Sequence, residues 1–107
     1  MDVLLYHTKT CHVWQTALKE VGDALIQAGI KANVKTVVVN TQEEAEKHRF
    51  LGSPTVHVNG KDVDSMAEKL TRYSLSSCRT YWWKGKSFEY PPKEMILSAL
   101  KGQSNAR

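Results

Sequence analysis

Cys11 is the residue of this sequence whose type and position best suit chemistry. It stands in the stretch YHTKTCHVWQ, residues 6–15, at the start of a helix-like pattern that Thr10 is expected to cap. Unpaired amides and the positive end of the helix dipole stabilise a thiolate at such a position, which favours nucleophilic attack. The position three residues on, where a dithiol site would hold a second cysteine, is Trp14. The sequence therefore predicts a reactive thiol without a neighbouring partner.

The elements around Cys11 predict a parallel β-α-β unit. The run 3–6 is short and apolar, as expected of a buried strand, and 34–39 is a β-branched, apolar run that also predicts a buried strand. Between them, apolar residues recur every three or four positions until Gly29, which supplies a helix stop. Two strands joined by one helix pair in parallel through a right-handed crossover. Cys11 is thus expected where the first strand meets the first helix.

The middle of the chain predicts short helices and an antiparallel hairpin. Thr41–Glu44 is a capping box, so a short helix should run to about Arg49. Asn59–Gly60 divides the strand-like residues 55–63, and both turn residues tolerate a positive φ, which predicts a hairpin. Ser65–Glu68 is a further capping-box pattern and predicts one or two turns of helix.

The last third of the chain predicts a second hairpin and a final helix. Two aromatic runs, 81–83 and 88–90, flank a turn that contains glycine. Pro91–Pro92 is expected to begin the helix, and Gly102 is expected to lie just past its end.

The predicted order is β-α-β-α-β-β, then an insert and a last helix. This is the order of the thioredoxin (glutaredoxin-like) fold, an α/β fold with a mixed central sheet flanked by helices. A chain of 107 residues that is 41% hydrophobic can bury one core. We expect residues 1–102 to form a single thioredoxin-like domain and residues 103–107 to be a flexible C-terminal tail.

Charge and composition exclude few partners. The formal net charge is +4, and the zone 69–86 carries basic residues without acidic ones, with Trp82 and Trp83 among them. Such a zone can grip phosphates and stack on bases, but no nucleic-acid motif accompanies it. A solvated edge with partly buried aromatic residues is the favoured interpretation, so nucleic acid is not expected as a partner.

The cysteine count and the N-terminal residues indicate in which cellular compartment the protein is expected. Residues 1–7 are too short for a signal-peptide core or a membrane span, so we expect a cytoplasmic protein without a membrane partner. Two cysteines in a reducing compartment are more often thiols than a structural disulfide. With four irregularly spaced histidines they do not form a closed zinc set, so no metal is expected.

The stretch 52–55, Gly-Ser-Pro-Thr, resembles the proline loop of the thioredoxin-like superfamily. Members of that superfamily hold a cis-proline at the start of the third strand, packed against the reactive cysteine. The resemblance implies that Pro54 is this residue and that the main chain before it faces Cys11 and can pair with an extended substrate. It therefore places Ser53, Pro54 and Thr55 in substrate binding.

A longer likeness narrows the resemblance. The segments 50–63, 78–81 and 91–96 are similar to small bacterial and archaeal thioredoxin-like proteins, often labelled alkylmercury-lyase-like or thioredoxin-family (seleno)proteins. The likeness spans residues 3–100. Members usually show Cys-Pro-x-Cys, Cys-Pro-x-selenocysteine or Cys-Pro-x-Trp at the first helix. Residues 11–14, Cys-His-Val-Trp, match the tryptophan variant with histidine in place of proline.

Cys78 falls on a matched segment, as Cys11 does, and the resemblance implies that the two act together. Cys11 would attack a disulfide or an oxidised substrate, and Cys78 would resolve the mixed disulfide. Two α-carbons more than about 7 Å apart cannot be bridged without movement of the backbone. A buried, structural Cys78 is the alternative.

Four further residues are candidates beside the thiols. Trp14 is expected in the core or at the wall of the site, and His12 is either a base or dipole partner for the thiol or a solvent-exposed residue. Arg79 either assists the neighbouring thiol or holds an anionic substrate such as glutathione, or it is an ordinary surface arginine. His57 is expected at the surface or in a cross-strand pair.

Three functions follow from these residues. The first is a thiol–disulfide oxidoreductase that acts on a thiol or disulfide substrate, which could be a protein, with glutathione as a possible co-substrate and no other cofactor. The second is capture of a soft metal ion or an organomercurial by thiolates. The third is a non-enzymatic binding module that uses the edge at 55–58 or the Trp82–Trp83 surface. Replacement of Cys11 by serine separates the third from the first two.

Overall fold

The computed structural model describes residues 1–75 and 78–104, and its centre is a four-stranded mixed sheet. The strands are β1 (Asp2–His7), β2 (Asn33–Val38), β3 (Thr55–Val58) and β4 (Lys61–Asp62), in the order β2-β1-β3-β4. β1 pairs in parallel with β2 and antiparallel with β3, and β3 pairs antiparallel with β4. The parallel unit and the Asn59–Gly60 hairpin are therefore both confirmed.

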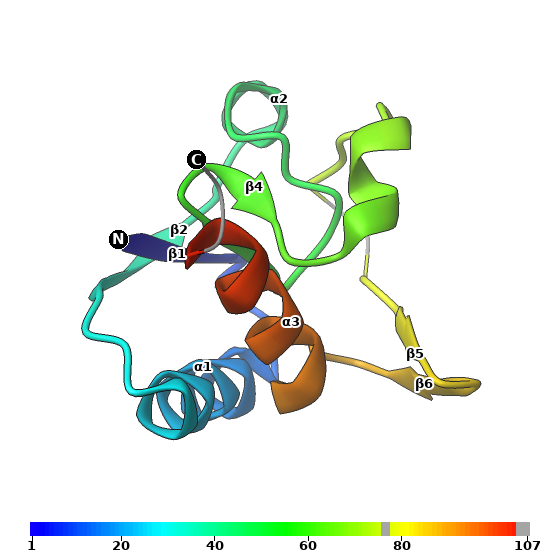
Figure 1. Ribbon diagram of the computed structural model, residues 1–107. Helices are drawn as coiled ribbons and strands as arrows, with labels where there is room; N and C mark the ends of the chain where they lie inside the picture. The colour runs from blue at the N-terminus through cyan, green and yellow to red at the C-terminus, as the bar shows by residue number, and fades with distance from the viewer. Residues whose placement is uncertain (76–77, 105–107) are drawn as a thin grey trace.

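Helices cover both faces of this sheet (Figure 1). α1 (Trp14–Ala28) and α3 (Lys93–Ser104) lie side by side on one face, and α2 (Gln42–Lys47) lies on the other. β1 contributes side chains to the packing against the helices on both faces of the sheet, because successive residues of a strand point to opposite faces. Val3 and Leu5 pack in the core with α1 and α3, whereas Tyr6 packs with Ala45 of α2.

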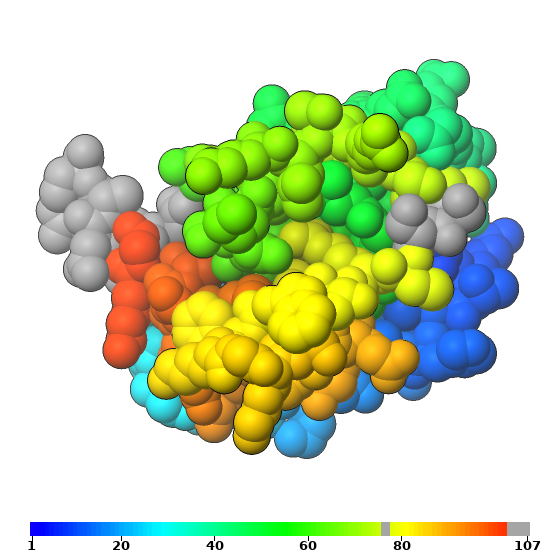
Figure 2. Space-filling view, turned by 90° about the vertical axis from the view of Figure 1, so that its right-hand side faces the viewer, coloured from blue at the N-terminus to red at the C-terminus, as the bar shows by residue number. Residues whose placement is uncertain are grey.

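A 3₁₀ helix, η1 (Ser65–Lys69), and a separate hairpin, β5 (Tyr81–Trp83) with β6 (Lys86–Phe88), complete the chain. Figure 2 shows the face that carries this hairpin, in yellow, below the green segment that includes η1. The two tryptophans of β5 lie on opposite faces of the strand, as successive residues of a strand do. Trp82 is 67% exposed, and Trp83 packs against the core. Together with the sheet order, these elements make the thioredoxin-like α/β fold that the element order predicts.

The first helix begins later than the sequence pattern predicts. α1 starts at Trp14, and its N-cap is Val13, which makes no side-chain capping bond. The expected cap at Thr10 is wrong because the chain there forms a turn, in which the Cys11 amide donates to the Thr8 carbonyl oxygen at 3.3 Å. Cys11 therefore lies in the loop before the helix, three positions ahead of its first residue.

Strand β2 is exposed, although its apolar sequence predicts burial. Val34 and Val38 are 37% and 38% exposed, and β2 is an edge of the sheet. Composition alone does not reveal which strand is an edge, because strand order depends on long-range pairing.

Other boundaries also differ from expectation. Asp64 caps η1 through its side chain, instead of Ser65, while the predicted capping box of α2 is present in full. α3 runs to Ser104, so it includes Gly102 and the first two residues of the predicted tail. Residues 105–107 of that tail lie outside the described residues.

Within the ranges 1–75 and 78–104, no helix is both long and apolar enough to cross a membrane.

Candidate functional site

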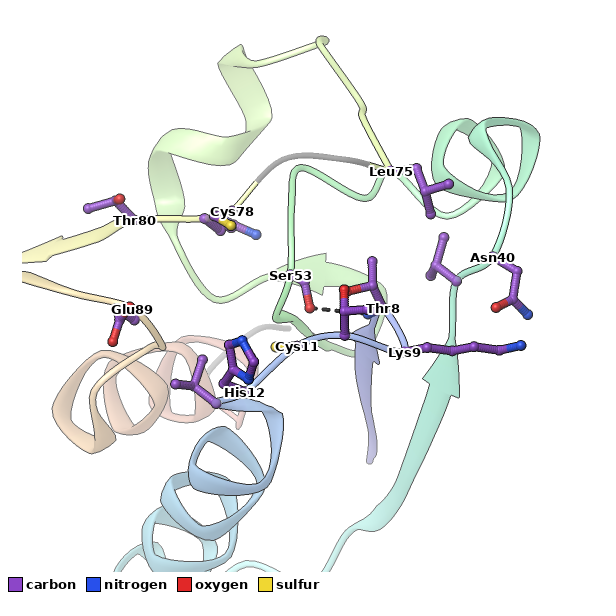
Figure 3. A pocket seen from close by; sticks show the side chains of 14 residues that line it. Thr8, Lys9, Cys11, His12, Asn40, Ser53, Leu75, Cys78, Thr80 and Glu89 are labelled. Carbon is purple, nitrogen blue, oxygen red and sulfur yellow. Dashed lines mark hydrogen bonds between the residues drawn. The ribbon is translucent and has the colours of Figure 1, made fainter.

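A cavity of about 650 Å³ lies where β1 gives way to α1. Five parts of the chain border it: the loop 8–13, the end of β2, the loop before β3, the segment that leads into β5, and Glu89 just after β6 (Figure 3). The predicted site residues on its lining are Cys11, His12, Ser53, Cys78 and Arg79. Residues distant in the sequence are therefore gathered at one place in the fold.

The two cysteines reach this cavity from different segments (Figure 3). Both are free thiols; Cys11 is partly exposed and Cys78 is exposed. The alternative of a buried, structural Cys78 is therefore wrong. A thiol needs access to its substrate to react, and both cysteines have that access.

Ser53 connects the Cys11 loop to the proline loop. Its hydroxyl oxygen accepts a hydrogen bond from the Thr8 amide at 3.1 Å. The Ser53–Pro54 peptide bond is cis. The buried hydroxyl of Thr55 donates to the Gly52 carbonyl oxygen at 2.6 Å, which fixes the loop on its other side. Hydrogen bonds thus hold the main chain on both sides of Pro54.

Cys78 is held against the same loop by its main chain. It forms a parallel β-bridge with Ser53, and the amide of Arg79 donates to the Ser53 carbonyl oxygen at 3.3 Å. The Tyr81 hydroxyl donates to the Pro54 carbonyl oxygen. The segment that carries Cys78 is therefore anchored to the residue before the cis-proline and to the cis-proline itself.

Arg79 has an internal role that the sequence did not suggest. The residue is only 8% exposed, and its guanidinium donates to both carboxylate oxygens of Asp62, at 2.6 and 2.8 Å. It also donates to the Thr55 hydroxyl at 3.1 Å and lies over the Tyr81 ring, 4.4 Å from its centroid. The alternative of an ordinary surface arginine is wrong, and the guanidinium proposed to hold an anionic substrate is already paired with Asp62.

His57 belongs to the same buried cluster. It stands opposite Asp62 in the β3–β4 ladder, with its Nε2 3.8 Å from Oδ2 of that carboxylate. The cross-strand alternative is therefore confirmed, and the surface alternative is wrong because His57 is buried. Burial lowers the pKa of His57 although Asp62 acts to raise it. Burial likewise raises the pKa of Tyr81 far above its ordinary value.

The lowered pKa of His57 predicts a loss of stability in mild acid. The unfolded chain binds a proton at His57 from about pH 6.5 downward, whereas the folded protein does so only at lower pH. The free energy of unfolding should therefore fall as pH drops below about 6.5 and level off below the folded-state pKa. Urea unfolding at a series of pH values should show this slope, and His57→Gln should reduce it. His12→Gln, at an exposed histidine, is the control. An unchanged slope in His57→Gln would contradict the assignment of this stability loss to His57.

Trp14 forms the wall behind the Cys11 loop. Its ring stacks on His7, with 4.3 Å between centroids and 3° between planes. His7 is buried, and its Nδ1 lies 2.8 Å from the Thr8 carbonyl oxygen, which also accepts the Cys11 amide. Trp14 thus stands where the second cysteine of a dithiol site would be, and it supports the loop instead of reacting.

Several residues of the site were missed from the sequence. Asp62 and Tyr81 are among them, because they act through buried contacts that sequence spacing does not reveal. His12 is exposed and borders the cavity, as do Lys9 and Glu89. Within the described residues, no group of three or more histidine, cysteine, aspartate or glutamate side chains is placed to hold a metal ion.

Comparison with known proteins gives a family and no characterised relative. No curated protein and no solved structure matches the chain. One family, described as Domain of unknown function (DUF2703), matches residues 6–100, which include both cysteines, the proline loop and the Arg79–Asp62 pair. Because the match covers nearly the whole thioredoxin-like fold, the chain belongs to the DUF2703 family.

Proposed function

We propose that this protein is a thioredoxin-like thiol–disulfide oxidoreductase in which Cys11 is the nucleophile and Cys78 the resolving thiol. The observation that carries the proposal is that two accessible free thiols from distant segments border one cavity. The resemblance to small thioredoxin-family (seleno)proteins supports it, because a Cys-x-x-Trp site lacks the neighbouring second thiol, and Cys78 can supply one from a distant segment.

The reaction is two successive exchanges. The Cys11 thiolate attacks one sulfur of a substrate disulfide, forms a mixed disulfide and releases the other half of the substrate as a thiolate, which takes up a proton. The Cys78 thiolate then attacks the Cys11 sulfur and releases the second half as a thiol. Two protein thiols are oxidised to one disulfide while the substrate disulfide is reduced to two thiols. Two molecules of a small thiol such as glutathione return the protein to its reduced form and leave as one disulfide.

The residues around the cysteines have positioning roles in this scheme. The Thr8 amide and the Ser53 hydroxyl connect the Cys11 loop to the proline loop at 3.1 Å. The main-chain bridge between Ser53 and Cys78 keeps the resolving thiol on the same cavity. Trp14 and His7 support the Cys11 loop from behind.

A redox titration with peptide mapping tests the proposal. After equilibration in a series of glutathione buffers, we expect reversible formation of a Cys11–Cys78 disulfide, with a midpoint between about −270 and −120 mV, as in known oxidoreductases. Mass spectrometry of tryptic peptides locates the bond and counts the free thiols. The proposal fails if neither thiol oxidises and Cys11 reacts with an alkylating reagent no faster than free cysteine.

Mercury(II) binding and the Cys11→Ser variant separate the other two functions. Capture of a soft ion by two thiolates would give a mercury(II) complex that requires both cysteines, without turnover of a disulfide. A binding module would retain its partner after Cys11→Ser, whereas exchange and metal capture would both be lost.

A further inference from the structure

The main chain beside Ser53 is already occupied by the protein itself. Extended polypeptides commonly bind by adding a strand to main-chain groups that have no partner. Here Cys78 forms a β-bridge with Ser53, and the Arg79 amide donates to the Ser53 carbonyl oxygen at 3.3 Å. The place where an extended substrate was expected to pair, next to Pro54, is therefore filled by residues 78–81, which we call the internal strand.

Buried polar contacts hold the internal strand in this place. The Arg79 guanidinium makes a two-point pair with Asp62, at 2.6 and 2.8 Å, and the side chain of Asp62 is only 8% exposed. The Tyr81 hydroxyl donates to the Pro54 carbonyl oxygen, and the ring is fully buried. Displacement of the internal strand would separate Arg79 from Asp62 and leave the buried carboxylate without its cation, which is costly.

The space that remains has the dimensions of a small-molecule site. The cavity of about 650 Å³ falls within the range of ligand pockets, roughly 300–1,000 Å³. Both thiols border it, and its rim carries polar side chains of both charges, including Lys9 and Glu89. Figure 2 shows the yellow internal strand near the blue residues that precede α1, the two sides between which the cavity lies.

We propose that the site reduces small-molecule disulfides and excludes extended polypeptide disulfides, with the Arg79–Asp62 pair as the determinant of this specificity. The inference rests on the proposed function. The electron balance is the same as above: Cys11 and Cys78 lose two electrons as they form a disulfide, and the small disulfide gains them and leaves as two thiols. The role assigned to Arg79 and Asp62 is to hold the internal strand in place.

Two substrates of identical chemistry test this specificity. One is N-acetylcysteine amide and the other a cysteine in the middle of an unstructured peptide, each as a mixed disulfide with 2-mercaptoethanol. Each rate is divided by the rate with dithiothreitol, which removes differences in intrinsic reactivity. The protein should favour the small substrate by at least about tenfold, because the internal strand fills the space that the peptide main chain on either side of the cysteine would need. Equal rates, or a faster peptide, would overturn the inference while leaving the oxidoreductase intact. Absence of exchange with both substrates would overturn the proposed function, and the inference with it.

A variant tests the cause of the specificity. Asp62→Asn removes one charge of the pair, and in the folded protein it should raise the peptide rate relative to the small-substrate rate. Lys84→Met breaks an exposed ion pair on the β5–β6 turn, with 3.8 Å between Lys84 Nζ and Glu94, and should leave the ratio unchanged. An unchanged ratio in a folded Asp62→Asn protein would overturn the assigned role of the pair. If that variant does not fold, the ratio measured with the parent protein still decides whether the site excludes extended polypeptides.

Discussion

Cys11→Ser is expected to lower the rate of disulfide exchange by about a thousandfold or more, because a serine hydroxyl is not ionised at neutral pH and cannot replace the thiolate as nucleophile. The loss should appear in the rate constant of the first step, the release of one thiol from a small disulfide. Stopped-flow absorbance with a chromogenic aromatic disulfide follows this step directly. The fold should persist, since Cys11 lies in a loop and is partly exposed.

Cys78→Ser is the matched variant, and its expected behaviour is different. The first attack by Cys11 should continue, but the mixed disulfide should accumulate because no second thiol resolves it. Intact-protein mass spectrometry would show the added mass of half a substrate on Cys11. Chemical unfolding of both variants serves as the control for stability.

The pattern across the two variants distinguishes the possible functions. A nucleophile elsewhere in the chain would be indicated if Cys11→Ser kept the parent rate. A Cys11 that is resolved by an external thiol would be indicated if Cys78→Ser turned over as fast as the parent protein. Capture of a soft ion would be favoured if the parent protein bound mercury(II) but showed no disulfide exchange, and if both variants lost that binding.

Arg79→Met should lower the free energy of unfolding by about 3–5 kcal/mol, because it leaves the buried Asp62 carboxylate without its cation. That carboxylate is 8% exposed and accepts two bonds from Arg79, at 2.6 and 2.8 Å. Asp62→Asn should also destabilise, since it leaves the Arg79 guanidinium without its bidentate partner. The double variant should cost clearly less than the sum of the two, because removal of both charges leaves neither unpaired. Urea unfolding followed by tryptophan fluorescence measures all three.

An exposed ion pair provides the control for this experiment. Lys19 and Asp23 are joined at 2.9 Å on α1, with side chains 74% and 42% exposed. Lys19→Met should not change stability measurably, because solvent and salt screen such pairs. Additive losses in the Arg79 and Asp62 variants would contradict the pair as one buried unit.

The elements that the sequence predicted correctly have local causes. The Thr41–Glu44 capping box is present in full, because both of its hydrogen bonds join residues three apart. The Asn59–Gly60 turn is also correct, and both residues have a positive φ. The start of α1 was predicted too early because the apolar period does not report the turn in which the Cys11 amide bonds to Thr8.

Part of the site was predictable because it also depends on residues that are neighbours in the sequence. Local signals place Cys11 and its neighbour His12 after the first strand, whereas only the resemblance to the thioredoxin-like superfamily places Ser53 beside Cys11. All three border the cavity. The association of Cys78 with this group rested on resemblance to a family, because nothing local in its sequence indicates the distant main chain with which it pairs. Nothing in the sequence singles out Asp62, although it stands only two residues after the predicted turn.

The sequence by itself thus determined the order of helices and strands, the turn chemistry and the place of one thiol at the end of the first strand. These features depend on neighbouring residues, whose propensities and hydrogen bonds act within a few positions. Only the tertiary structure decided that β2 is an exposed edge, that Cys78 lies beside Ser53, and that Arg79 is buried against Asp62. Those outcomes depend on strand order and on the balance between charge desolvation and pairing, which are set by contacts between segments far apart in the chain.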